Sequence, residues 1–171
     1  MSQSDAATTV VVREVQPHDF EAWLSLWDGY NAFYGRAGAT ELAKEITQKT
    51  WERFFNPIEP VFALVAEDAG EVVGLAHYIF HRSTTRLGPV CYLQDLFTAP
   101  TRRQLGVGKA LISSVYRQAM LAGSDRVYWQ TQSTNEAGRA LYDKLAKHSG
   151  FIVYSHELQP LAPDERMRPV D

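Results

Sequence analysis

The sequence predicts an α/β (α+β) fold in which a mixed central sheet carries helices on both faces. Three observations support this prediction. Stretches rich in β-branched and aromatic residues alternate with amphipathic stretches in the order β-α-α-β-β-β-α-β-α-β. The turn at residues 68–71 separates two strand-like stretches and is typical of an antiparallel hairpin. Residues 91–111 have the pattern of a strand, a glycine-bearing loop and a helix in succession.

The first 98 residues are predicted to contain four strands and two helices. Residues 9–15 include three consecutive valines, which favour a strand. Pro17 and Asp19 indicate a helix start, because proline suits the first turn and an acidic side chain complements the helix dipole. The expected elements are a strand at 9–15, helices at 20–34 and 40–55, strands at 61–67 and 72–81, and a central strand at 91–98.

The rest of the chain is predicted to contain two helices and two strands. Leu111, Val115 and Ala119 recur at helical spacing after the glycine-bearing loop, and Gly123 follows as a stop. The later elements are a strand at 126–132, a helix at 136–147 and a last strand at 151–158. Gly74, inside the strand 72–81, suggests a bulge.

The 171 residues are expected to form one domain, at residues 9–158. Residues 1–8 are predicted to be a flexible N-terminus, and residues 159–171, which contain several prolines, an irregular tail. The polar start does not resemble a secretory signal, and no apolar run is long enough to span a membrane. We therefore expect a cytoplasmic protein without a membrane partner.

Composition narrows the function further. A formal net charge of −3 argues against general binding to nucleic acids. The single cysteine, Cys91, excludes an internal disulfide and is expected to be an inert thiol within a strand. His77 and His81 are four residues apart, but a strand does not bring such a pair together around a metal. No metal site is predicted.

The loop from Arg102 to Gly108 has the features of an anion-binding site. Gly106 and Gly108 let the backbone approach a ligand and turn its N–H groups outward. The N-terminus of the following helix adds partial positive charge, and Arg102, Arg103 and Lys109 add full charges. A pyrophosphate is the natural occupant of such a loop.

Two common phosphate-binding motifs do not fit this loop. The dinucleotide-binding motif needs a third small residue where Leu111 stands. The P-loop needs a glycine where Arg103 stands and a serine or threonine where Ala110 stands. The residues by themselves leave two interpretations: a pyrophosphate loop of another kind, or an ordinary glycine-bearing turn between a strand and a helix.

The pattern Arg103-x-x-Gly106-x-Gly108 resembles the coenzyme A pyrophosphate loop of the GNAT N-acetyltransferase superfamily. Other features of that superfamily follow in the expected order, and the resemblance covers roughly residues 61–158. They are Asn135 in a turn, Ala140-Leu141-Tyr142 on a helix and Gly150-Phe151 after it. Residues 92–97, 127–131 and 140–144 are most similar to the fungal histone and polyamine N-acetyltransferase branch.

The resemblance implies the GNAT acyl-CoA N-acyltransferase fold, with a mixed sheet that splays apart between its fourth and fifth strands. It implies an acetyl-CoA-dependent N-acetyltransferase that uses acetyl-CoA as cosubstrate and needs no metal. The acceptor would be a primary amine, either of a small polyamine or amino-acid-like molecule or of a lysine side chain. Similar proteins are frequently dimers, so a homodimer is expected.

The resemblance also implies the coenzyme-binding residues. The backbone of residues 96–98 would hold the pantetheine arm, the backbone of residues 103–109 the pyrophosphate, and Asn135 would hydrogen-bond the arm. The full set is Leu96, Phe97, Thr98, Arg103, Gln104, Leu105, Gly106, Val107, Gly108, Lys109 and Asn135.

Catalysis would be direct attack of the amine on the thioester. Tyr142 matches the family tyrosine near the coenzyme sulfur and is the implied general acid; the alternative is a packed aromatic side chain. The polyamine enzymes carry Glu-Asp where this chain has Gln94 and Asp95, and Gln94 cannot accept a proton. Asp95, directly or through a water, is then the implied base, unless it is a structural carboxylate. Strand alternation predicts that only one of the two faces the amine.

The acceptor side is expected to involve the first helix, where Asp28, Tyr30 and Tyr34 would suit a small cationic amine. For the two tyrosines the alternative is a stripe that packs against the core. Two other functions stay open at this stage. One is an enzyme that uses another acyl-CoA or acts on an antibiotic, and the other is a non-catalytic acyl-CoA-binding module, which Gln94 in place of glutamate would favour.

Overall fold

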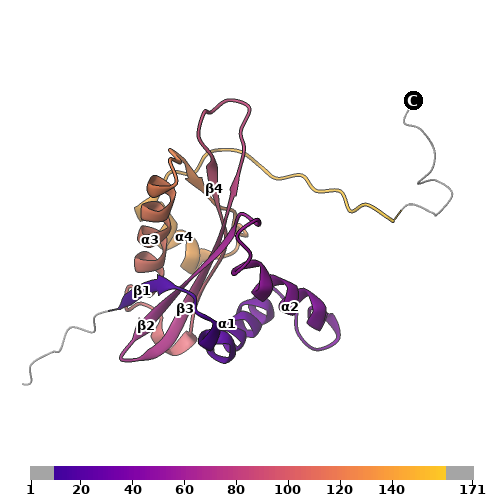
Figure 1. Ribbon diagram of the computed structural model, residues 1–171, viewed down its shortest axis with the longest axis vertical. Helices are drawn as coiled ribbons and strands as arrows, with labels where there is room; N and C mark the ends of the chain where they lie inside the picture. The colour runs from indigo at the N-terminus through magenta and orange to yellow at the C-terminus, as the bar shows by residue number, and fades with distance from the viewer. Residues whose placement is uncertain (1–9, 161–171) are drawn as a thin grey trace, which may run out of the picture.

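The computed structural model describes residues 10–160 and contains a five-stranded sheet with helices on both faces (Figure 1). The strand order is β1-β2-β3-β4-β5, antiparallel through β4, with β5 parallel to β4. The predicted mixed sheet is therefore confirmed. The strands are β1 (Val11–Glu14), β2 (Val61–Asp68), β3 (Glu71–His81), β4 (Val90–Thr98) and β5 (Val127–Tyr128). The α-helices are α1 (Phe20–Phe33), α2 (Lys44–Arg53), α3 (Val107–Leu121) and α4 (Glu136–Leu145).

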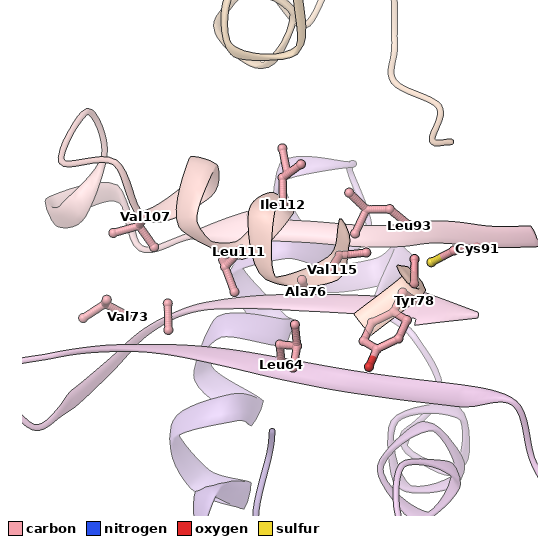
Figure 2. Close-up of a cluster of buried hydrophobic side chains, with 12 residues drawn as sticks. Leu64, Val73, Ala76, Tyr78, Cys91, Leu93, Val107, Leu111, Ile112 and Val115 are labelled. Carbon is pink, nitrogen blue, oxygen red and sulfur yellow. The ribbon is translucent and has the colours of Figure 1, made fainter. Parts of the chain in front are cut away.

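Apolar clusters on both faces of the sheet hold the helices in place. On one face, α3 packs against β2, β3 and β4, and Figure 2 shows Leu111 and Val115 pointing toward the strands that carry Leu64 and Ala76. On the other face, α1 buries a tryptophan and tyrosine stripe against Leu75 and Phe97. This second cluster consists of Trp23, Leu26, Trp27, Tyr30, Leu75 and Phe97. Tyr30 therefore packs in the core, as the alternative for the two tyrosines of this helix expects, while Tyr34 packs at the edge of the cluster.

Gly74 allows α3 to approach the sheet closely. A Cβ at this position would lie 2.8 Å from Cγ1 of Val107 and 3.1 Å from Cδ1 of Leu111. The register between β2 and β3 shifts beside it, because Ala66 pairs with Gly74 and Glu67 with Val72. The predicted bulge is therefore confirmed, and the missing side chain brings the N-terminus of α3 close to β3 and β4.

An ion pair connects β1 to the short segment that precedes α1. Arg13 donates hydrogen bonds to both carboxylate oxygens of Asp19, at 2.7 and 2.9 Å, and one to Glu67 at 3.0 Å. The backbone N–H of Gln16 adds a 2.7 Å bond to the same aspartate. The hydrogen bond from Arg13 is the largest cause of the lowered pKa of Asp19.

Several predicted boundaries need correction. The predicted strand at 151–158 is wrong: these residues form no strand and are exposed. The strand predicted at 126–132 shrinks to Val127–Tyr128. Both errors have one physical cause, because no strand lies beyond β5 in the described chain and an unpaired strand has no ladder of hydrogen bonds to stabilise it. The helix predicted at 40–55 is also shorter, since a 3₁₀ turn (Gly38–Thr40) precedes α2.

Two further points concern the limits of the chain and the membrane. The expectations for residues 1–8 and 161–171 lie outside the described residues. None of the helices within residues 10–160 combines the length and the apolar character that crossing a bilayer requires.

Candidate active site

The sheet opens between β4 and β5. These strands pair only at Cys91–Val127 and Tyr92–Tyr128 and then separate, so the predicted splay is confirmed. From Leu93 onward the edge of β4 that faces β5 has no strand partner, and alternate backbone N–H and C=O groups point into the gap. A cavity of about 770 Å³ lies here, a size typical of small-molecule sites.

The cavity gathers residues from β4, the glycine-bearing loop, α3 and α4. All the predicted coenzyme-binding residues line it except Leu105, which is exposed outside it. Arg102, expected in the anion-binding loop, and Ala140 and Leu141, part of the family motif, line it too. The prediction missed four further lining residues, because they lie on helix faces that carry no motif. These are Phe33, Ala137, Gly138 and Lys144.

The loop before α3 is shaped for an anion. Gln104 and Gly106 both have left-handed backbone conformations, with φ of 64° and 84°. A Cβ on Gly106 would meet no atom within 4 Å, so this position favours glycine for its backbone angle and not for lack of space. Gly106 is the N-cap of α3, and the first N–H groups of that helix have no partner within it. The loop and helix start therefore present several backbone donors.

The charged side chains that line the cavity are all basic. Arg102, Arg103, Lys109 and Lys144 line it, and no aspartate or glutamate of residues 10–160 does. Asp68 and Glu71 form salt bridges with Arg102 at 3.7 and 3.3 Å, which hold its guanidinium at the rim. The guanidinium of Arg103 lies 5.8 Å from the ring centre of Phe97. The residues present fit a polyanionic ligand such as the pyrophosphate of coenzyme A.

Gly108 and Asn135 join α3 to α4 at the cavity wall. A Cβ on Gly108 would lie 3.1 Å from Cδ2 of Leu141, so the glycine permits close packing of the two helices. Asn135 is the N-cap of α4: its side chain accepts a hydrogen bond from the N–H of Gly138 at 3.1 Å and donates one to Oγ1 of Thr131 at 2.9 Å. Asn135, which is predicted to bind the pantetheine arm, is therefore also the structural cap of α4.

Tyr142 lies on α4, where it lines both the main cavity and a smaller hollow that adjoins it. Its ring makes an edge contact with Trp129, at 5.5 Å between ring centres. Burial, followed by the charge of Tyr34, raises the pKa of Tyr142 to about 12. The phenol thus keeps its proton throughout the physiological range and is available as a donor.

A smaller hollow adjoins the main cavity. Its volume is about 20 Å³, enough for one water molecule. Tyr30, Tyr34 and Tyr142 line both spaces, so the hollow continues the cavity toward α1. Gln94 and Gln130 supply further polar groups there.

Gln94 is the extra residue of a β-bulge. Where β3 pairs with β4, His77 lies opposite Asp95 and Tyr78 lies opposite Leu93, so Gln94 has no partner. The bulge reverses the side-chain alternation, because Leu93 packs in the cluster under α3 while Phe97 packs in the cluster under α1. Regular alternation is therefore interrupted at Gln94 and Asp95, and of the two only Gln94 lines a hollow.

Asp95 is buried and lines neither hollow. The indole N–H of Trp23 donates to Nε2 of His77 at 2.9 Å, and Nδ1 of His77 lies 2.9 Å from Oδ2 of Asp95. Because an indole N–H can only donate, Nε2 accepts and the ring proton is on Nδ1, which donates it to Asp95. Burial is the first cause of the raised pKa of Tyr30, and the nearby Asp95 carboxylate is the second. Tyr30 also lines both hollows, so it is the residue near Asp95 that reaches the cavity.

The acceptor residues are only partly brought together. Tyr30 and Tyr34 line both hollows, whereas Asp28 is on the exposed face of α1 and lines neither. Arg36, which sequence reasoning did not name, lines neither hollow but lies beside both tyrosines: its guanidinium carbon is 5.7 and 5.5 Å from the ring centres of Tyr30 and Tyr34. Its Nε donates to Oδ1 of Asn31 at 2.7 Å, which fixes the head group. No motif marks an arginine after a glycine turn, so the sequence offered no signal for it.

The sequence is similar to that of known N-acetyltransferases. The sequence matches the profile of the acetyltransferase (GNAT) family over residues 23–146. It is 33% identical over 147 residues to the D-amino-acid N-acetyltransferase HPA3 of Saccharomyces cerevisiae, covering 85% of this chain and 89% of that protein. It is 27% identical over 145 residues to the uncharacterized N-acetyltransferase YhfO of Bacillus subtilis, covering 84% and 94%.

Solved structures agree with the fold. The structure of AAC(6')-Iy in complex with the bisubstrate analog CoA-S-monomethyl-acetylneamine matches with a TM-score of 0.73 at 17% identity, covering 89% of this chain and all of that one. The likeness confirms the predicted architecture, including the open sheet.

Proposed function

This chain belongs to the GNAT acetyltransferase family and is an acetyl-CoA-dependent N-acetyltransferase, and on that premise we propose that it acetylates the amino group of a small amino acid. The observation that carries the acceptor class is Arg36, a cation beside the two tyrosines of the acceptor end. The yeast relative, named for D-amino acids, supports the same class.

Coenzyme binding is assigned to the wedge between β4 and β5. The unpaired edge of β4 at Leu96–Thr98 offers backbone groups to the amides of a pantetheine arm, much as a sheet edge binds an extended peptide. The N–H groups around Gly106 and the start of α3 would bind the pyrophosphate. Acetyl-CoA supplies the activated acetyl group, and the chain supplies orientation and proton transfer.

Tyr142 is proposed as the general acid. It lies where the main cavity meets the smaller hollow. Its pKa of about 12 keeps the phenol protonated, so it can donate to a sulfur that gains negative charge as the thioester breaks. No other tyrosine hydroxyl on α4 is available for this role.

Asp95 is proposed as the final proton acceptor, acting through Tyr30. An alkyl ammonium must lose a proton before its nitrogen can attack. The Tyr30 hydroxyl would take that proton, directly or from a water in the small hollow, while it passes its own to Asp95. His77 holds the carboxylate in place and stabilises its charge through the 2.9 Å hydrogen bond.

Arg36 is proposed to bind the carboxylate of the acceptor. Its Nε is engaged by Asn31, and its two terminal nitrogens are directed away from that bond. A guanidinium recognises a carboxylate through two parallel hydrogen bonds, which a polyamine cannot provide. Such a contact would orient the neighbouring amino group toward Tyr30 and the thioester.

The acceptor proposal is tested by comparing an amino acid with its methyl ester in a thiol-release assay. Loss of a charge-assisted contact costs about 1.5–3 kcal/mol, so kcat/KM for the ester should be roughly 10- to 100-fold lower. Arg36→Gln should lower kcat/KM for the amino acid to the level of the ester and leave the ester rate unchanged. Arg86→Gln, which removes an arginine bound to Asp125 outside the cavity, is the matched control.

Equal rates for amino acid and ester in the unmodified enzyme would contradict this acceptor class. The same assay with D- and L-amino acids, spermidine, a lysine peptide and an aminoglycoside would then identify the alternative. Replacing acetyl-CoA with propionyl-CoA tests the acyl group in parallel.

A further inference from the structure

Three buried polar side chains form a hydrogen-bonded chain that joins three elements behind the active site. Trp23 lies on α1, His77 on β3 and Asp95 on β4, and their exposed fractions are 0%, 2% and 8%. Two hydrogen bonds of 2.9 Å connect them. Because buried polar groups cost free energy unless they are paired, a fully paired chain among apolar side chains points to a specific role.

Aromatic rings surround the imidazole of His77. They come from α1 and from the end of α2, and they are Trp23, Trp27 and Phe54, at 6.0, 5.2 and 4.7 Å between ring centres. Asp95 is the one charged side chain that the imidazole contacts in the described part of the chain. The titratable side chains that α1 adds to the neighbouring apolar cluster are Tyr30 and Tyr34.

The hydrogen bond from Trp23 occupies the one lone pair of the neutral imidazole. Nε2 of His77 accepts the indole N–H, and Nδ1 carries the ring proton toward Asp95. No lone pair of the imidazole is left to take a proton from Asp95, and a second proton on Nε2 would require the indole bond to break. His77 is therefore a donor to the carboxylate and not a competing base.

From this arrangement we infer that Trp23 is a positioning residue for catalysis, which acts through His77 on Asp95. The inference rests on the proton path of the proposed function. Because Trp23 keeps His77 neutral, Asp95 is the end of that path. A proton that arrives through Tyr30 stays on the carboxyl group and returns to solvent through the same hydroxyl after the product leaves.

Loss of the indole N–H would change the chemistry of the whole chain. His77 could then take a second proton and form an imidazolium beside Asp95. A carboxylate paired with a full positive charge accepts a proton less readily, so the base would weaken. Trp23 and Tyr30 lie about two turns apart on α1, so one helix carries both the group that fixes His77 and the group that delivers the proton.

Nitrogen NMR of the full chain, with its histidines labelled with ¹⁵N, tests the tautomer without any acceptor substrate. The chain has five histidines, and His77→Asn identifies the signals of His77 by their loss. We expect a protonated Nδ1 and an unprotonated Nε2 in the unmodified chain, unchanged from about pH 5.5 to 8.5. In Trp23→Phe the same ring should take up a second proton within this range. A proton on Nε2, or a ring that titrates in the unmodified chain, would overturn the inference.

The pH dependence of kcat tests the role in catalysis. Trp23→Phe should lower kcat roughly 3- to 10-fold near neutral pH, the effect of one hydrogen bond, with little change in KM for acetyl-CoA. The deficit should close as the pH approaches the pKa of the amine, because free amine no longer needs Asp95. Trp27→Phe is the matched control: it removes an indole beside the same imidazole, but that indole bonds Thr47 at 3.2 Å. Any loss in this control should be the same at every pH.

A deficit in Trp23→Phe that is the same at every pH, or that Trp27→Phe reproduces in full, would overturn the role of Trp23. If Trp23→Phe fails to fold, benzothienylalanine at this position, which has the size of tryptophan but no N–H, replaces it. Asp95→Asn separates the two proposals. If that variant keeps the pH profile of the unmodified enzyme, the proton path is wrong and this inference falls with it. An altered profile in Asp95→Asn together with a constant deficit in Trp23→Phe contradicts only the role of Trp23.

Discussion

At the scale of single residues, Tyr142 is the side chain with the most specific chemical role. It lines both the main cavity and the smaller hollow, and burial raises its pKa to about 12. In the proposed mechanism it donates a proton to the leaving sulfur.

Tyr142→Phe is therefore expected to lower kcat about 100-fold while the affinity for acetyl-CoA changes little, because only the donor is lost. Steady-state kinetics and calorimetric titration measure the two effects. Tyr116→Phe, which removes a hydroxyl that bonds Leu145 outside the cavity, is the control. Because the phenol ionises only near pH 12, the enzyme should show no alkaline loss of rate from Tyr142 below about pH 10. Unchanged turnover in Tyr142→Phe would remove it from the mechanism.

Asp95→Asn tests the proton path. Without the carboxylate, the reaction depends on amine that has already lost its proton in solution. The rate should fall about 100-fold near neutral pH and then rise about tenfold per pH unit up to the amine pKa. Tyr30→Phe should reproduce this profile, since the proposed proton path runs through the Tyr30 hydroxyl to Asp95. A variant that is less stable but keeps the pH profile of the unmodified enzyme would mean that Asp95 is only structural.

The sequence was sufficient to propose Tyr142 and Asn135, because the motif that contains them is local. It was insufficient for the Asp95 environment. His77 lies 18 residues from Asp95 and Trp23 lies 54 residues from His77, and only the folded sheet brings them together. The bulge at Gln94 was also hidden, since it depends on the pairing of two strands.

At the scale of elements, the junction between β4 and α3 is the proposed anion-binding unit. Gly106 combines a left-handed backbone with the N-cap position, and the start of α3, whose first N–H groups have no partner within the helix, lines the cavity. This unit was predictable, since its glycines and basic residues are adjacent in the chain. The short β5 was not, because strand length depends on a neighbour that the sequence does not identify.

Gly106→Val tests the loop. A β-branched side chain strongly disfavours a φ of 84°, so the loop should distort and acetyl-CoA affinity should fall at least tenfold in calorimetric titrations. Gly106→Asn should keep most of the affinity, because asparagine tolerates this conformation. Gly123→Val places similar strain, at φ 76°, after the other end of α3 and controls for stability alone. Normal affinity in Gly106→Val would contradict the loop assignment.

At the scale of the whole molecule, the fold class follows from the order of elements, and the GNAT family assignment follows from the profile match and the yeast relative. The order of elements does not predict that β5 ends the sheet in the part of the chain that the structure describes. Stability of the whole molecule depends in addition on the bond between Arg13 and Asp19, which ties the segment before α1 to the sheet.

The lowered pKa of Asp19 predicts acid sensitivity. A carboxylate whose pKa is lowered on folding contributes stability above its unfolded pKa of 3.8, and that contribution is lost as the pH falls through the folded value. Asp19→Asn should reduce the free energy of unfolding by about 2 kcal/mol at pH 7, and this difference should shrink below pH 3.8. Asp125→Asn, at an exposed ion pair, should have little effect. Urea denaturation across pH is the measurement; a difference that persists at low pH would exclude the ionic contribution.

The measurement that tests the account most directly is thiol release from acetyl-CoA in the presence of D- and L-amino acids, with the N-acetylated product quantified. The account predicts saturable release, one acetylated amino acid per thiol, and loss of both in Gly106→Val. Absence of coenzyme binding, or coenzyme binding without acetyl transfer to any of these amino acids, would contradict it.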